Sequence, residues 1–164
     1  SIVLHWLAAG AVVALFLTHE GERGSAARLF HVGGGAVLGV LLLWRVGHRL
    51  LNGWTRKPAQ PAALNWLSSL VLWGLLAAIV VVVLTGYLLP WSLGRPLDIF
   101  AILAIPSPIA RTPWLHEAVE GLHEFSGDAF LPLLLLHVLG AAKHAFIDRD
   151  GVAARILRPL AGGR

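Results

Sequence analysis

The chain of 164 residues contains no cysteine and no methionine, and only 13% of its residues are charged. The absence of cysteine excludes disulfides, iron–sulfur clusters held by thiolates, and haem attached covalently through a C-x-x-C-H motif. With 57% hydrophobic residues, the chain also has too little charge to cover the surface of a soluble domain of this size. The lipid bilayer is therefore its expected solvent.

Four apolar stretches dominate the sequence, and each is close to the roughly 20 residues that cross a hydrocarbon core about 30 Å thick. They cover residues 2–18, 29–51, 62–89 and 121–147. We therefore predict an all-α fold, an integral membrane four-helix bundle that forms a single domain over residues 1–164. Because the apolar run begins at once after Ser1 and lacks the features of a signal peptide, we expect a short N-terminal piece to precede it.

The connections between these stretches differ in length. Residues 90–120 carry five prolines and are expected to form a long loop, which is typical of a lid or a binding surface. The 62–89 stretch contains neither charge nor histidine, so we expect it only to complete the bundle.

The basic residues predict the orientation in the membrane. They form no run interleaved with aromatics, so a nucleic-acid partner is not expected. Four of them (Arg23, Arg28, Arg95 and Arg111) fall on one side, and nine fall on the other: Arg45, Arg49, Arg56, Lys57, Lys143, Arg149, Arg155, Arg158 and Arg164. The positive-inside rule then places both termini in the cytoplasm and the 90–120 loop on the periplasmic side.

Eight histidines are many for so apolar a chain, and ionisable groups inside a membrane span point to function. His123 and His137 lie 14 residues apart, which is four helical turns and a rise of about 21 Å on nearly one face. Given the directions of the helices, His31 should lie at the depth of His123, and His5 at the depth of His137.

Two layers of paired histidines follow, and we predict that they hold two b-type haems whose iron takes His5, His31, His123 and His137 as axial ligands. Without methionine or cysteine, a haem held by two axial side chains is expected to be bis-histidine. His19 is an alternative to His31 as the outer ligand. The remaining histidines are expected near the membrane surface, where His48 is interfacial and His116 and His144 support the ligands or handle protons.

Several motifs resemble the bacterial cytochrome b-561 family along essentially the whole chain. The clearest runs from Leu122-His123-Glu124 through His137 to the Lys143–Val152 tail, followed by Ile156-Leu157-Arg158-Pro159. The others are His5-Trp6-Leu7, Phe30-His31-Val32-Gly33 and Gly94-Arg95-Pro96.

The resemblance implies a di-haem protein of the bacterial inner membrane that passes electrons between quinone and another partner, with ligands at the four histidines named above. One similar member type oxidises superoxide on the outer face and reduces ubiquinone, and a related branch supplies the cytochrome b subunit of nickel–iron hydrogenases. We expect an electron carrier that contacts membrane lipid, quinone and a soluble or small-molecule donor on the periplasmic side. A redox enzyme acting at the outer haem and a histidine-based ion transporter are the alternatives, and no catalytic residue is assigned.

Overall fold

The computed structural model describes residues 2–52, 60–152 and 154. It contains the four helices α1 (Ile2–Leu17), α2 (Ala26–Leu51), α3 (Ala62–Ser92) and α4 (Pro113–Ala142). A π-helical turn, η1 (Lys143–Asp148), continues α4, and the short strands β1 (Leu97–Ile99) and β2 (Leu103–Ile105) form an antiparallel hairpin. The predicted four helices are confirmed. Arg56, Lys57, Arg155, Arg158, Arg164 and the motif at 156–159 lie outside the described residues.

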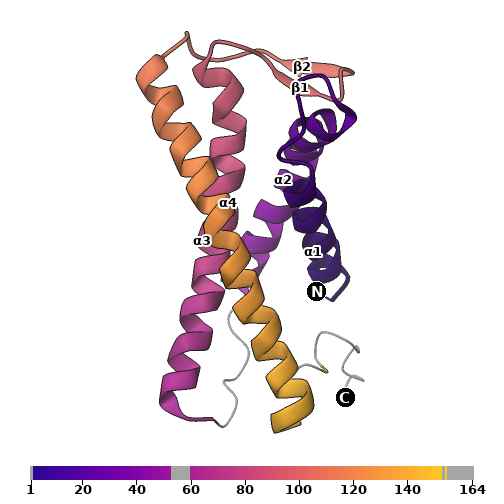
Figure 1. Ribbon diagram of the computed structural model, residues 1–164, viewed down its shortest axis with the longest axis vertical. Helices are drawn as coiled ribbons and strands as arrows, with labels where there is room; N and C mark the ends of the chain where they lie inside the picture. Colours follow the sequence, from indigo (N-terminus) through magenta and orange to yellow (C-terminus); the bar gives the residue numbers. More distant parts are fainter. Residues whose placement is uncertain (1, 53–59, 153, 155–164) are drawn as a thin grey trace.

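The four helices are linked in chain order, each packing against the next (Figure 1). α3 packs closely along α4, and α1 packs along α2, while α2 also contacts α3. Within the described ranges, backbone contacts between α4 and the α1–α2 pair are few. The hairpin lies at one end of the molecule, next to the start of α2 (Figure 1).

The sequence predicted a long loop over residues 90–120, and this predicted extent is wrong. α3 continues through Pro90 to Ser92, and α4 begins at Pro113 rather than at residue 121. Hydropathy detects the apolar part of a helix and misses polar turns that extend it, here the turns with His116, Glu117 and Glu120. A proline at the first helical position also favours a start at Pro113, because its missing N–H has no helical partner there in any case.

Three of the helices are long and apolar enough to cross a membrane: α2, α3, and α4 together with η1. α1 is also apolar but has 16 residues, so at about 1.5 Å per residue it rises about 24 Å, less than the hydrocarbon thickness. Large apolar side chains such as Trp66 (73% exposed) and Phe125 (72% exposed) point outward. This pattern matches a bundle surrounded by lipid.

Two small clusters form the core. Val71, Leu75 and Ala78 of α3 pack with Phe130 of α4, and Ala8, Leu42 and Val83 join α1, α2 and α3.

The hairpin docks on α2 at a glycine. A Cβ atom at Gly33 would lie 2.7 Å from the backbone nitrogen of Phe100, so only glycine allows this approach. Phe100 and Ala101 both have positive φ, the backbone of a tight hairpin turn, and the Asp98 carboxylate accepts a hydrogen bond from the Ala101 N–H at 2.7 Å. Because Gly33 lies two residues after His31, the hairpin is held beside the predicted outer site.

Candidate cofactor site between the helix pairs

The structure brings His31 of α2 and His123 of α4 together at the end of the bundle near the hairpin. Their ring centres are 6.2 Å apart and their planes are perpendicular. The two rings meet between α2 and α4, whose backbones make few contacts with each other.

Hydrogen bonds orient both rings of this outer pair. Nδ1 of His31 donates to the carbonyl oxygen of Leu15 in α1 at 2.9 Å. Nδ1 of His123 lies 3.1 Å from Oγ1 of Thr85 in α3, and that hydroxyl already donates its proton to the Val81 carbonyl at 2.6 Å. The Thr85 oxygen must therefore accept from Nδ1 of His123. In both histidines Nε2 is then the unprotonated nitrogen, which is the form that can bind a metal.

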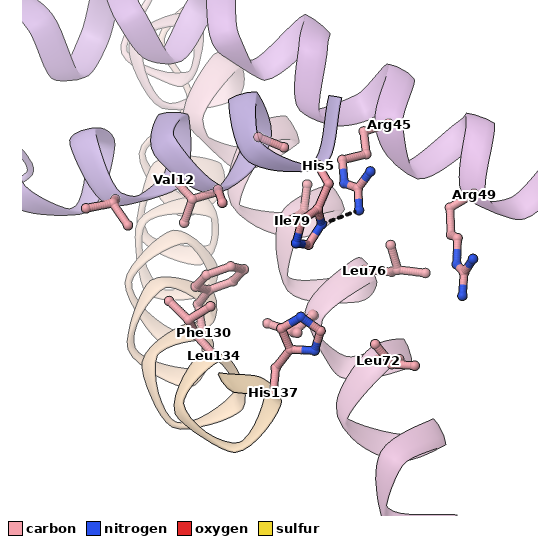
Figure 2. Close-up of a pocket in the computed structure, with 14 residues that line it drawn as sticks. His5, Val12, Arg45, Arg49, Leu72, Leu76, Ile79, Phe130, Leu134 and His137 are labelled. Carbon is pink, nitrogen blue, oxygen red and sulfur yellow. Dashed lines mark hydrogen bonds between the residues drawn. The ribbon is translucent and has the colours of Figure 1, made fainter. Parts of the chain in front are cut away.

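The structure likewise brings together His5 of α1 and His137 of α4, in the half of the bundle away from the hairpin. Their ring centres are 6.3 Å apart with planes inclined at 62°. Figure 2 shows the two rings facing each other in a cavity, with Phe130 and Leu134 on one side of them and Leu72 on the other.

This inner cavity is bounded by all four helices. Apart from the histidines its lining is almost entirely apolar, and the exceptions are Arg45 and Arg49 of α2. The NH2 group of Arg45 donates to Nδ1 of His5 at 2.8 Å (Figure 2). The cavity is lined by His5, Ala8, Ala9, Val12, Val13, Arg45, Arg49, Leu72, Leu75, Leu76, Ile79, Phe130, Leu134 and His137.

His19, the alternative outer ligand, is near enough to His31 and His123 to interact with both electrostatically, but its ring packs against Phe16. It follows the end of α1, where its Nδ1 bonds to the Phe16 carbonyl and its Nε2 lies 3.8 Å from Glu20. Its side chain is 47% exposed. His48 is exposed on α2.

His116 lies on α4, seven residues before His123. Its Nδ1 is 2.9 Å from Oγ of the fully buried Ser92, and its Nε2 is 3.9 Å from Glu120. The Ser92 hydroxyl donates to the Leu89 carbonyl, so its oxygen accepts from His116. This bond ties the start of α4 to the end of α3, beyond the outer pair.

His144 lies in η1 at the other end of α4. Its Nδ1 is 2.8 Å from the Asp150 carboxylate and 3.2 Å from that of Asp148, which also accepts from Lys143. Hydrogen bonds, first of all one from the Val152 backbone N–H, hold the pKa of the Asp150 carboxyl below its usual value. These contacts fasten the end of α4.

The role expected for the 62–89 stretch is wrong in one respect. α3 does more than complete the bundle, because Thr85 is a hydrogen-bond partner of His123, and a Cβ atom at Gly86 would lie 3.2 Å from Cε1 of that ring. The sequence feature that could have indicated this role is the pair Thr85-Gly86, which interrupts a run of aliphatic residues. Arg45 was interpreted only as a topology signal, yet it lines the inner cavity.

The ring separation in both pairs is close to that of two imidazoles on opposite sides of one metal ion. A bond from a metal ion to an imidazole nitrogen is about 2.0–2.1 Å long, and that nitrogen lies about 1.2 Å from the ring centre, so opposite ligands have ring centres about 6.4 Å apart. The observed separations are 6.2 and 6.3 Å. The apolar lining of the inner cavity also suits a flat apolar macrocycle.

Fold and site together define a helical membrane protein with two pairs of facing histidines between its helices. A family model described as prokaryotic cytochrome b561 matches residues 1–159, and the chain belongs to this family. The predicted family is thereby confirmed. Membership implies a multi-pass membrane protein that contains b-type haem and transfers electrons through it.

One curated relative is cytochrome b561 homolog 2 of Escherichia coli (strain K12). It is 28% identical over 74 residues, which are 45% of this chain and 39% of that protein. The matched region thus spans about two fifths of the relative's length.

Proposed function

We propose that this protein carries electrons through two bis-histidine b-type haems, one held by His31 and His123 and the other by His5 and His137. The observation that carries the proposal is the pair of ring separations, 6.2 and 6.3 Å, at two positions 14 residues apart on α4. Each haem, when bound, supplies a one-electron ferric/ferrous couple. Two axial side chains fill the iron's coordination, which suits electron transfer rather than activation of a bound ligand.

The chain's own residues hold and orient the two sites. Leu15 and Thr85 accept the Nδ1 protons of the outer pair, which leaves both Nε2 atoms free for iron. α4 contributes one histidine to each pair, so a single rigid helix sets their spacing, about 21 Å along its axis. Haems at this spacing would have edges close enough for electron tunnelling.

We further propose that the protein lies in the bacterial inner membrane with both termini in the cytoplasm. The supporting observation is the distribution of Lys and Arg in the sequence, which has nine of them from the end of the second apolar stretch to the third and in the C-terminal part, against four in the other two connections. In this orientation a soluble or small-molecule donor meets the outer pair from the periplasm, and the quinone pool, such as ubiquinone, is the other redox partner. Superoxide is one candidate donor.

A cavity under the hairpin bears on the choice between carrier and enzyme. It has a volume of about 530 Å³ and is lined by Ala36, Val37, Val40, Tyr87, Trp91, Leu97, Ile99 and Ile105. The Tyr87 hydroxyl, one of its few polar groups, is already used, because it donates to the Ala36 carbonyl at 2.8 Å. An apolar lining does not attract a small anion such as superoxide, and this favours the electron carrier.

The ion-transporter alternative expects carboxylates beside the paired histidines. The hydrogen-bond partners described for these rings are a carbonyl, a hydroxyl and a guanidinium. In the part of the chain that the structure describes, the cluster of three side chains able to bind a metal ion is His144, Asp148 and Asp150, at the end of α4 and outside both pairs. We therefore do not favour transport.

The test is a haem count combined with a reduced-minus-oxidised spectrum of the purified protein. We expect two low-spin b-type haems per chain, one after His137→Ala, and one after His31→Ala. His48→Ala, which changes an exposed histidine of α2, is the matched control and should keep both. Loss of both haems in each single variant, or loss of the outer haem in His19→Ala, would contradict the assignment of the layers.

A further inference from the structure

Arg45 places a permanent positive charge in an apolar cavity. Its guanidinium contacts His5, and the next turn of α2 adds Arg49 to the same lining. None of the described residues that line this cavity is Asp or Glu. Cationic side chains are costly at such positions, and inside a bundle they usually serve a binding partner of opposite charge.

The hydrogen bond between Arg45 and His5 conflicts with iron binding by His5. A guanidinium can only donate, so Nδ1 of His5 must accept. A neutral imidazole that accepts at Nδ1 carries its proton on Nε2, and a protonated nitrogen cannot bind iron. For His5 to serve as a ligand through Nε2, the guanidinium must leave Nδ1 and take another acceptor nearby.

We propose that Arg45 binds a carboxylate of the inner haem. This inference rests on the proposed function, because it requires a haem between His5 and His137. Haem b is a flat apolar macrocycle with two carboxylate side chains on one edge, and the cavity offers two histidines, an apolar lining and two arginines. An arginine–carboxylate pair is a strong charge-assisted bond with matching planar geometry. The transfer of the guanidinium from His5 to this carboxylate frees Nδ1 to carry the proton, so that Nε2 can bind iron.

The location of Arg45 also determines how the macrocycle lies. Both arginines belong to the second half of α2 (Ala26–Leu51), and Figure 2 shows Arg45 on the side of the cavity away from Val12 and Phe130. A haem whose carboxylate binds Arg45 would have its carboxylate edge on the α2 side of the cavity.

The experiment compares two porphyrins, haem b and its dimethyl ester, in which both carboxylates are esterified. Protein with the His31→Ala change, made in a haem-deficient host and purified in detergent, offers only the inner site. Titration followed by the Soret absorbance gives the two dissociation constants. We expect haem b to bind more tightly than the ester by about ten- to a hundredfold, the range for a hydrogen bond to a charged group. Arg45→Gln should reduce this preference by weakening haem b and leaving the ester unchanged, with Arg49 still lining the cavity.

Matched variants make the outcome specific. Lys143→Gln removes the same charge at the same end of the bundle without touching the cavity, and should keep the full preference. Arg45→Lys keeps the charge without the two-pronged geometry, and should give an intermediate preference. If Arg45→Gln fails to fold, the protein with Arg45 still tests the idea, because equal binding of haem b and ester overturns it.

Two results separate this inference from the proposed function. If Arg45→Gln retains the preference, or weakens both porphyrins equally, Arg45 does not bind the carboxylate. If His137→Ala in the same background still binds haem b with an unchanged low-spin spectrum, the inner site itself is wrong.

Discussion

Replacing Thr85 by valine removes one hydroxyl group beside His123 and leaves the side chain almost the same size. The Thr85 oxygen lies 3.1 Å from Nδ1 of His123, and the residue is only 6% exposed. Water therefore has little access to replace the lost acceptor, and the Nδ1 proton of His123 would lose the oxygen that Thr85 supplies.

Two independent ranges give the size of the effect. A buried donor without a partner costs about 1–3 kcal/mol. Loss of a group that orients a metal-binding histidine typically lowers metal affinity about 10- to 100-fold, which is about 1.4–2.8 kcal/mol. The ranges overlap, so we expect Thr85→Val to weaken the outer haem by about 10- to 100-fold. The potential of that haem should also rise, because the hydrogen bond makes the imidazole a better ligand for ferric iron.

The assay is a haem titration and a redox titration in the His137→Ala background, where only the outer site is filled. Thr85→Ser is the matched control, since it keeps the oxygen and should retain the affinity and potential of Thr85. An unchanged affinity and potential in Thr85→Val would refute the reasoning. A serine variant as weak as the valine variant would show that the methyl group of Thr85, rather than its oxygen, supports the site.

Three further predictions concern other parts of the molecule. Gly33→Val should displace the hairpin, because its Cβ atom would lie 2.7 Å from the Phe100 nitrogen. Limited proteolysis should then cut the hairpin faster than in the unchanged protein. The control is Gly47→Val, which has open space around it and should be cut at the unchanged rate. Asp150 has a lowered pKa, so its contribution to the η1 turn is present above the usual value of 3.8 and is lost as the pH falls through the lowered value. Hydrogen exchange of this turn should thus accelerate in acid, and Asp150→Asn should exchange fast at every pH; equal rates at neutral pH would contradict this. In His31→Ala, a membrane-impermeant donor on the hairpin side should reduce the remaining haem slowly, and rapid reduction in stopped-flow spectra would contradict an electron path through the outer pair.

The approach of the histidines could be predicted because helix geometry is regular. A spacing of 14 residues keeps His123 and His137 on one face, and alternating helix directions bring His31 and His5 to the matching depths. The structure brings these rings together as expected, and their role as haem ligands remains a prediction.

The parts that sequence reasoning missed depend on contacts between distant segments. The hairpin at 97–105 has strands of three residues, too short for a period-two pattern, and it is positioned by contact with Gly33. Thr85 and Arg45 likewise gain their roles only when α3 meets α4 and α2 meets α1. Hydropathy also set the start of α4 too late, because polar turns carry no apolar signal.

The few contacts between α4 and the α1–α2 pair have a consequence for how the protein is made. α1, α2 and α3 pack on one another in chain order and α4 packs on α3, so the helices can join one after another as they enter the membrane during synthesis. α4 and the α1–α2 pair then have few backbone contacts, and the facing histidines span the space between them. Haem insertion would accordingly be the maturation step that fastens α4 to α1 and α2, and cells short of haem should degrade the newly made chain through membrane quality control.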